Sequence, residues 1–422
     1  MKDRIYLCID LKTFYASCEC VDRGLDPFTT NLIVADPSRG NGAICLAISP
    51  AMKALGIHNR CRVFEIPKNV KYIVALPRMK RYMEISAQIY SIYLKYVAPE
   101  DIHVYSIDEC FIDATSYLSL YKKSPKELAK IIMDDVYSQT GICATAGIGT
   151  NLFLCKVALD ISAKHAEDHM GYLDEKLFKE TLWHHKPITD IWNISRGIAN
   201  RLLKYGVSDL YGITQIDEKI LYKEFGVNAE LLIDHAWGKE SCTIEDIHKY
   251  KSKSNSLSNS QVLFEDYDYE DALLVVKEMV DLKCLELIDK HLMTNSIYLG
   301  IGYSKDVRKP TGGSFSLDEY TSSEKKLMNY FIRLFTETTD PLYPIRKISI
   351  GFGNVIDENF ICPNLFTDVE GELKEKKAQQ TILAIKKKYG KNAILKAMNY
   401  ENKATTRKRN KLIGGHNSGE DD

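Results

Sequence analysis

Two adjacent carboxylates interrupt an otherwise apolar stretch, VYSIDECFIDAT, which runs from Val104 to Thr115. Asp108 and Glu109 repel each other, and their apolar neighbours disfavour the charged form of both side chains. In a flat β-strand successive side chains point to opposite faces, so the pair could not share a ligand there. At the turn of a hairpin both side chains can point toward one site. The stretch therefore predicts two short strands joined by a turn that carries both carboxylates.

A third carboxylate, Asp10, ends the short β-rich run IYLCI, which is typical of a buried strand. If the strands are neighbours in one sheet, Asp10 would join Asp108 and Glu109, and their negative charge would require cations. Oxygen-only ligands, without His or Cys, favour Mg²⁺ or Mn²⁺ over zinc. Two such ions are the usual apparatus of phosphoryl or nucleotidyl transfer. The alternative for an isolated Asp–Glu pair is a solvated hairpin turn without a ligand.

Composition excludes several classes of protein. The 422 residues are too many for one ordinary core, and 45% hydrophobic with 27% charged residues is typical of a soluble globular protein. There is no apolar run of the roughly 18 residues that a membrane span needs, and no secretory signal is expected. The 11 cysteines include no C-x-x-C pair, which favours reduced thiols in a cytoplasmic protein. The net charge of −1 does not indicate nucleic-acid binding by itself.

Strand and helix patterns alternate over about the first 170 residues, which predicts an α/β or α+β domain. From Gly171 to about Lys239 the pattern becomes helical. The polar, serine-rich stretch KYKSKSNSLSNS, from Lys249 to Ser260, is typical of a linker. Beyond it, a β-α-β-α-β order predicts a second compact domain, and a lysine-rich helical tail follows Asn359.

Three segments resemble, in order and spacing, the signature blocks of Y-family DNA polymerases, in particular the UmuC-like and DinB-related members. They are DLKTFYASCE, YSIDECFIDAT and GIGTNLFLCKVALDISAKH, and the resemblance covers residues 1–360. KALGI and the terminal IGGH are similar too. The resemblance implies an α/β (α+β) multidomain fold with a right-hand polymerase architecture. Its parts would be a ferredoxin-like palm, small fingers, a helical thumb and a separate α/β little-finger domain.

The implied domain boundaries are as follows: palm 1–13 and 80–170; fingers 14–79; thumb with a helix-hairpin-helix-like segment 171–240; linker 241–255; little finger 256–358; basic C-terminal tail 359–422. The resemblance implies a template-directed, low-fidelity, lesion-bypass DNA polymerase acting in DNA repair and damage tolerance. It would come from a bacterium, a phage or a mobile element. Two alternatives are a catalytically inactive DNA-binding relative and a palm-domain nucleotidyl cyclase, which should show a GG-D/E-EF-type hairpin and needs no thumb.

By this resemblance Asp10, Asp108 and Glu109 are the catalytic carboxylates. The backbone carbonyl of Leu11 would complete the ligands of two Mg²⁺ ions, with Mn²⁺ as the alternative ion. Tyr15, five residues after Asp10, matches the steric-gate position, where its ring would clash with a ribose 2′-hydroxyl. The alternative for Tyr15 is an ordinary core aromatic.

Phe14, beside the gate position, is expected to pack locally or to line the sugar pocket. Lys53, in SPAMKALGI, and Lys164, in ISAKH, match positions where the family places cations on the triphosphate of the incoming deoxynucleoside triphosphate. Lys156 lies eight residues before Lys164 on the same helical face and is a further candidate. For a lone helix lysine, the alternative is a solvated helix face.

The segment DIWNISRGIANRLLKYGV resembles the family's helix-hairpin-helix, with Asn193 and Ser195 in place of the usual loop glycines. The loop is therefore either reshaped or a weak DNA-binding element. Arg196 in this segment, with Lys251 and Lys253 in the linker, are candidate contacts to primer–template DNA. Phosphate contacts carry no sequence information, which suits a polymerase that must act anywhere on DNA.

The segment ICPNLFTD lies where bacterial relatives carry a short peptide that binds the sliding clamp. Leu365 and Phe366 match the hydrophobic end of that peptide, although its leading glutamine is absent, and local packing is the alternative. The lysine-rich tail could bind nucleic acid or a partner, or could be a solvated extension. No membrane partner is expected.

Overall fold

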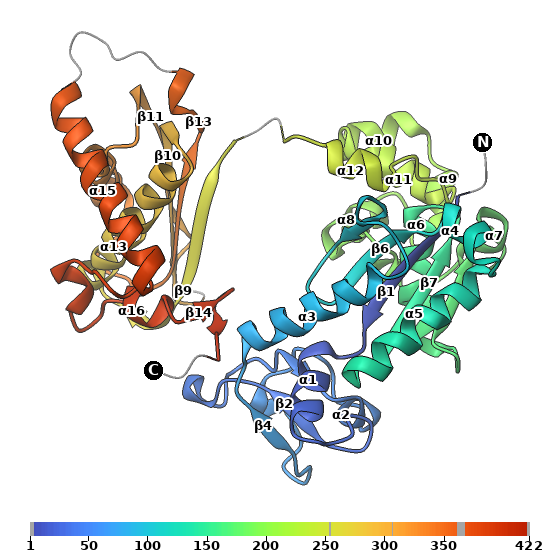
Figure 1. Cartoon of the computed structure of the whole chain (residues 1–422). Helices are drawn as coiled ribbons and strands as arrows, with labels where there is room; N and C mark the ends of the chain where they lie inside the picture. The colour runs from blue at the N-terminus through green and yellow to red at the C-terminus, as the bar shows by residue number, and fades with distance from the viewer. Residues whose placement is uncertain (1–3, 253–254, 306, 361–367, 420–422) are drawn as a thin grey trace. The chain divides into compact units, whose positions relative to one another are not determined.

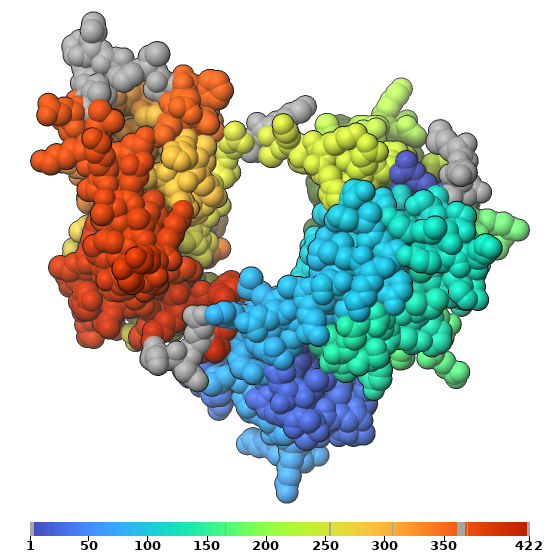
Figure 2. Space-filling view, in the orientation of Figure 1, coloured from blue at the N-terminus to red at the C-terminus, as the bar shows by residue number. Residues whose placement is uncertain are grey.

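The computed structural model of the chain describes residues 4–252, 255–305, 307–360 and 368–419. The chain divides into two compact units: Met1–Tyr250 with His416–Asp422, and Lys251–Gly415. Most of the first unit is coloured blue to yellow-green in Figure 2, and most of the second is gold to red. None of the helices within the described ranges has the length and apolarity needed to cross a bilayer.

A five-stranded sheet in the order β5-β6-β1-β7-β8 forms the centre of the first unit (Figure 1). Its strands are β1 (Tyr6–Leu11), β5 (Ile102–Val104), β6 (Glu109–Asp113), β7 (Ala144–Gly149) and β8 (Met170–Leu173). β1 lies between β6 and β7 and is antiparallel to both, whereas β7 and β8 are parallel. The strand predicted near Asp10 and the strand–turn–strand predicted around Asp108 are both confirmed.

Helices cover the two faces of this sheet. α6 (Leu152–Val157), continued by a π-helical turn at Ala158–Ser162, packs on the face that carries Cys8 and Phe111. α3 (Met79–Tyr93) and α5 (Pro125–Thr140) lie on the other face. A Cβ atom at Gly147 of β7 would come within 2.0 Å of the Cys155 carbonyl oxygen. Glycine therefore lets α6 lie directly on the strand, which brings the side chains of this helix close to the edge that carries Asp10.

A second, three-stranded sheet in the order β3-β2-β4 lies in the part of the first unit predicted as fingers. Its elements are β2 (Leu32–Val34), β3 (Ala47–Ile48) and β4 (Ile73–Ala75), with α1 (Phe14–Asp22) and α2 (Pro50–Ala54) beside them. The predicted start of α2 is confirmed, because Ser49 Oγ accepts a hydrogen bond from the Met52 amide at 3.3 Å. Ile33, Ile48 and Met52 belong to the small buried core of this part.

Between Gly171 and Lys239 the first unit is helical, as predicted, apart from the end of β8, which was not predicted, and further helices lie outside this range. Its helices are α4 (Thr115–Tyr121), α7 (Glu175–Leu182), α8 (Arg196–Leu203), α9 (Leu210–Thr214), α10 (Glu218–Phe225), α11 (Asn228–Ala236) and α12 (Ile244–Lys249). The apolar faces of α7 to α11 share a core with Phe153 of α6. α12 falls within residues 241–255, for which a linker is predicted, and its Ile244 is buried with Tyr6 and Phe111.

The second unit contains an antiparallel sheet in the order β11-β10-β12-β9. Its elements are β9 (Leu257–Tyr267), α13 (Tyr269–Asp289), β10 (Leu292–Tyr303), β11 (Thr311–Thr321), α14 (Glu324–Thr338), β12 (Ile345–Gly353) and β13 (Ile356–Asp357). The predicted β-α-β-α-β order is wrong in one respect, because it lacks β11. Only Leu317 and Thr321 of this strand are buried, so its sequence shows little hydrophobic alternation.

The C-terminal segment is folded. It contains α15 (Val369–Tyr389), α16 (Thr406–Arg409) and the paired short strands β14 (Leu412–Ile413) and β15 (His416–Asn417). α15 packs on α13 of the second unit. The carboxylate of Glu278 in α13 is 1% exposed and accepts hydrogen bonds from the Thr405 amide at 2.6 Å and from Asn399 Nδ2 at 2.9 Å. Residues 368–415 are thus part of the second unit rather than a solvated extension.

Candidate active site

The three predicted carboxylates lie together at one edge of the central sheet. Asp10 of β1 is paired directly with Glu109, the first residue of β6. The Leu11 amide donates a hydrogen bond to the Asp108 carbonyl oxygen at 2.9 Å, which joins the end of β1 to the turn before β6. The structure therefore brings Asp10, Leu11, Asp108 and Glu109 into one site, although almost 100 residues separate Asp10 from the other two carboxylates.

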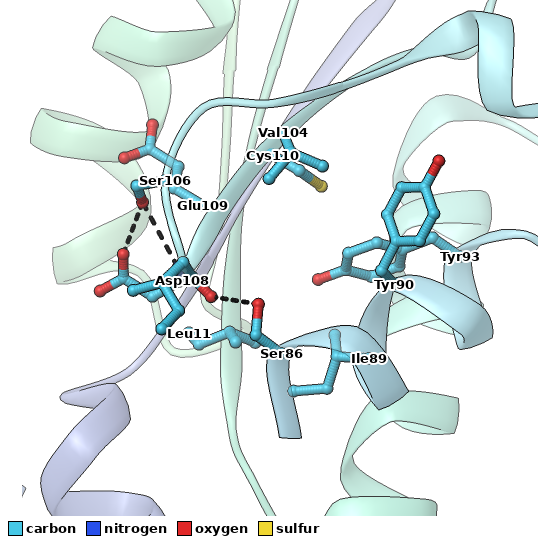
Figure 3. Close-up of a pocket in the computed structure, with 11 residues that line it drawn as sticks. Leu11, Ser86, Ile89, Tyr90, Tyr93, Val104, Ser106, Asp108, Glu109 and Cys110 are labelled. Carbon is cyan, nitrogen blue, oxygen red and sulfur yellow. Dashed lines mark hydrogen bonds between the residues drawn. The ribbon is translucent and has the colours of Figure 1, made fainter. Parts of the chain in front are cut away.

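Local hydrogen bonds fix the turn that carries Asp108. Ser106 Oγ donates to Asp108 Oδ1 at 2.6 Å, and Ser86 Oγ of α3 donates to the Ile107 carbonyl oxygen at 2.6 Å. Figure 3 shows the carboxylates of Asp108 and Glu109 on the same side of the hairpin. The turn thus removes the alternation that would separate neighbouring side chains within a strand.

Glu109 forms a buried ion pair with Lys156 of α6. The two side chains are each 9% exposed, and Lys156 Nζ lies 2.8 Å from Glu109 Oε1. Lys156 Nζ also lies 3.1 Å from Asp160 Oδ2, and Cys8 Sγ donates to Glu109 Oε1 at 3.1 Å. Burial opposes a charged ammonium, but Glu109 and then Asp160 outweigh it and raise the pKa of Lys156. Lys156 is therefore engaged with the carboxylates.

The ionisation of Asp10 reflects its burial and its charged neighbours. Burial, with a further contribution from the charges of Asp108 and Glu109, raises the pKa of Asp10 to about 7. Lys156 and Lys164 oppose the shift. A site that holds three adjacent carboxylates is stabilised by a cation, and its all-oxygen donors suit a hard divalent ion.

The donor set fits a divalent metal in its chemistry, but the side chains are not arranged around one point. In the part of the chain that the structure describes, there is no group of three His, Cys, Asp or Glu side chains positioned to hold a metal ion. One oxygen of Glu109 is instead paired with Lys156. Lys156 keeps Asp160 as a partner, so Glu109 can turn without leaving an unpaired buried ammonium.

Two predicted nucleotide-binding cations lie near the carboxylates. Burial and then the neighbouring Lys164 lower the pKa of Lys53, whereas Asp10 opposes the shift. Lys164 is half exposed, and its Nζ lies 3.1 Å from Asp160 Oδ1. Lys53, Lys164 and Asp10 therefore lie close enough for their charges to act on one another.

Sequence reasoning missed a third cation, Lys12. The ammonium of Lys12 contributes to the lowered pKa of Lys53, after burial and Lys164, and lies 3.1 Å from His169 Nδ1. Burial also lowers the pKa of Lys12 itself. The sequence does indicate this cation, because Lys12 follows Asp10 by two positions in the segment DLKTFYASCE.

The aromatic residues after Asp10 form a stack at the start of α1. The ring of Tyr15 lies parallel to that of Tyr82 of α3, with 4.6 Å between centroids. Phe14 is 2% exposed and lies 5.8 Å from Tyr15, so Phe14 packs in the core. Burial and then the charge of Asp108 raise the pKa of Tyr15. Tyr15 is thus a half-buried ring held beside the carboxylate site.

The predicted DNA contacts lie outside this cluster. Asn193 has φ 68°, the left-handed conformation that glycine adopts readily, and Ser195 Oγ caps α8 by accepting from the Ile198 amide at 3.4 Å. Asn193 therefore adopts a backbone conformation typical of glycine, although the loop has no glycine at this position. Arg196, the first residue of α8, and Lys251 are exposed. Three predicted contacts lie outside the described residues: Lys253, Leu365 and Phe366.

Comparison with known proteins identifies the family. The model of the impB/mucB/samB family matches residues 9–160, and that of the impB/mucB/samB family C-terminal domain matches residues 254–362. The chain is 31% identical over 418 residues to UvrX of Bacillus subtilis (strain 168), described as a UV-damage repair protein. This match covers 98% of the chain and 97% of UvrX. The chain belongs to the impB/mucB/samB family.

Further comparisons agree with this family and with its fold. DNA polymerase IV 2 of Bacillus subtilis (strain 168) is 27% identical over 424 residues, covering 99% of each chain. A solved Y-family DNA polymerase chimera superposes with a TM-score of 0.64 and 19% identity, covering 84% of this chain and 99% of the chimera. The predicted UmuC-like, Y-family membership and mixed α/β fold of this impB/mucB/samB protein are confirmed. Y-family enzymes in general depend on divalent metal ions and act on DNA and nucleotides.

Proposed function

We propose that this protein is a template-directed DNA polymerase of the low-fidelity, lesion-bypass type, which adds deoxynucleotides to a primer 3′ end. The observation that supports it best is the pairing of Asp10 with Glu109 beside Asp108, where burial and then the neighbouring carboxylates raise the pKa of Asp10 to about 7. The enzyme would act in DNA repair and damage tolerance. Its DNA substrate and the reduced thiols expected from the sequence both fit the cytoplasm.

The predicted domain boundaries are part of this proposal. The five-stranded sheet that carries the carboxylates would be the palm, and the three-stranded sheet with α1 and α2 would be the fingers. Helices α7 to α11 would form the thumb, and the second unit would contain the little finger. Within this division Arg196 and Lys251 would contact the phosphates of primer–template DNA, so affinity should fall as salt rises. Leu365 and Phe366 would contact a sliding clamp.

Asp10, Asp108 and Glu109, with the backbone carbonyl of Leu11, would hold two Mg²⁺ ions, or Mn²⁺ in their place. Bound there, such ions lower the pKa of a primer 3′-hydroxyl and neutralise charge on the leaving pyrophosphate. Ser106 keeps Asp108 at a fixed orientation through its 2.6 Å hydrogen bond. The Asp108 carboxylate therefore enters the reaction already positioned.

The cations beside the carboxylates would bind the incoming nucleotide. Lys53 and Lys164 would act as point charges on the triphosphate, and Lys12 is a third ammonium in the same region. Mutual repulsion among these ammonium groups would be relieved when a polyanion binds between them. Tyr15, supported by its stack on Tyr82, would lie under the sugar.

Primer extension tests the proposed function directly. With Mg²⁺, a labelled primer on undamaged and lesion-bearing templates should be lengthened by template-directed nucleotides. A chelator should stop the reaction, and excess Mg²⁺ should restore it. DNA binding without any extension would instead support a catalytically inactive relative. A cyclic product formed from free nucleotide, without use of the primer, would support the cyclase.

Tyr15→Ala should raise the use of ribonucleotides relative to deoxynucleotides by roughly 100-fold, about 2.7 kcal/mol of discrimination. The reason is that the ring would no longer clash with the 2′-hydroxyl. The measurement is the ratio of kcat/KM values for the two sugars opposite the same template base. Tyr15→Phe keeps the ring and should discriminate like the unchanged protein. Wild-type discrimination in Tyr15→Ala would exclude Tyr15 as the gate.

A further inference from the structure

The last described residues of the chain belong to the first unit and lie against the start of α3. The Lys80 amide donates a hydrogen bond to the Ser418 carbonyl oxygen at 2.9 Å, and Ser418 is only 5% exposed. His416–Asp422 are grouped with Met1–Tyr250, whereas the residues just before them belong to the second unit.

The start of α3 lacks a cap from its own sequence. The first amides of a helix have no acceptor within the helix, and a side-chain oxygen of the N-cap residue usually serves one of them. The N-cap residue here is Arg78, which offers no side-chain acceptor and makes no cap hydrogen bond. The Arg78 guanidinium is bound instead to Glu19 and Asp22. The Ser418 carbonyl thus accepts a hydrogen bond at the start of α3, where the side chain of the N-cap residue provides none.

Two further observations support this position of the C-terminal residues. Gly419 has φ +83°, and a Cβ atom there would lie 2.7 Å from Arg78 Cβ and 2.9 Å from Arg78 Cα. Only glycine allows so close an approach at that backbone conformation. Burial lowers the pKa of His416, and the charges of Arg39 and Asp36 also act on its ring. The C-terminal residues therefore contact α3, and His416 lies close enough to Asp36 and Arg39 for their charges to act on its ring.

The other end of the C-terminal segment is anchored in the second unit. Thr405 and Thr406 amides and Asn399 Nδ2 donate to the buried carboxylate of Glu278, at distances from 2.6 to 3.2 Å. From Thr406 to His416 the chain advances ten residues, which reach ~35 Å at most when extended. This segment is thus a short connection between two fixed ends.

We infer that the start of α3 is a binding surface for the chain's own C-terminal residues 416–419, which tether the second unit to the first at both of its ends. One tether is the linker after Tyr250, and the other is the segment before His416. The tether limits how far the second unit can move away from the first. This inference does not depend on polymerase activity, and neither of its readouts measures catalysis.

Gly419→Val in the full chain tests the surface by hydrogen exchange. The added side chain would clash with Arg78, so the Lys80 amide should exchange at least about tenfold faster, as an uncapped first-turn amide does. Gly390→Val is the matched control. Gly390 also has a positive φ, +96°, but nothing lies within 4 Å of its Cβ position. This control should leave Lys80 exchange unchanged.

Two results of the hydrogen-exchange experiment would contradict the inference. One is wild-type exchange at Lys80 in Gly419→Val. The other is a protection of Lys80 that rises with protein concentration, because contact between copies would then replace contact within one chain.

Small-angle X-ray scattering tests the tether itself. The radius of gyration of Gly419→Val without DNA should exceed that of the unchanged protein and of Gly390→Val, because only the linker would restrain the second unit. Loss of Lys80 protection without any increase in the radius of gyration would exclude a restraining role for the C-terminal residues.

Discussion

Asp108→Asn is expected to lower kcat/KM for primer extension by about 1,000-fold or more, which corresponds to ~4 kcal/mol. The substitution removes one negative charge from the proposed metal-binding carboxylates. It should leave the fold intact, because the amide oxygen of asparagine can still accept the hydrogen bond that Ser106 Oγ gives at 2.6 Å. Primer–template affinity should therefore stay within about threefold of the unchanged protein.

Asp113→Asn is the matched control, since Asp113 is the last residue of the same strand, β6. Asp113 accepts from the Thr115 amide at 3.0 Å and lies 3.9 Å from Arg4, away from the carboxylate site. Extension by this variant should match that of the unchanged protein. Equal extension by Asp108→Asn would remove Asp108 from catalysis, and loss of its thermal transition would show that the fold had failed instead.

The convergence of the carboxylates could be predicted because each one is marked locally. Asp10 follows an apolar strand pattern, and Asp108 with Glu109 interrupts another. The pairing of these strands could not be derived from the two patterns, because hydrophobic alternation fixes a face and not a neighbour. The resemblance to Y-family polymerases predicts that the two strands bring their carboxylates together, and the pairing of Asp10 with Glu109 agrees with this prediction.

The partners of these side chains were harder to predict. An ideal helix places Lys156 and Lys164 on one face, but a π-helical turn at Ala158–Ser162 lies between them. Lys156 is brought to Glu109 by the close packing of α6 on β7, which depends on Gly147. The contact of the C-terminal residues with α3 joins segments more than 300 residues apart, and no local pattern signals it.

Glu19→Ala is expected to reduce the free energy of unfolding of the first unit by about 3 kcal/mol. The Glu19 side chain in α1 is fully buried, and its carboxylate binds the guanidinium of Arg78 at 2.8 Å and the hydroxyl of Tyr82 at 2.8 Å. It also pairs with Arg23. Alanine would leave Arg78 with Asp22 as its remaining partner and the buried hydroxyl of Tyr82 without its acceptor.

Solvent limits the size of this effect. Removing one partner of a buried ion pair typically lowers stability by about 3–5 kcal/mol, and the Arg78 side chain is 33% exposed, so the lower end applies. The melting temperature of the first unit should fall by roughly 6–12 °C. Glu84→Ala on α3 is the control: this exposed carboxylate lies 3.6 Å from Arg81, and its loss should change stability by at most about 0.5 kcal/mol.

The same carboxylate connects stability to the proposed sugar gate, because Tyr82 stacks on Tyr15 at 4.6 Å. Glu19→Gln keeps an acceptor for the Tyr82 hydroxyl but loses the charge that binds Arg78, so stability should fall while sugar discrimination stays near wild type. Glu19→Ala removes both and should weaken discrimination as well. If Glu19→Ala has the same melting temperature as the unchanged protein, Glu19 does not hold α1 on α3. If Glu19→Ala is destabilised but keeps the wild-type discrimination between ribonucleotides and deoxynucleotides, Tyr15 is positioned without help from Glu19.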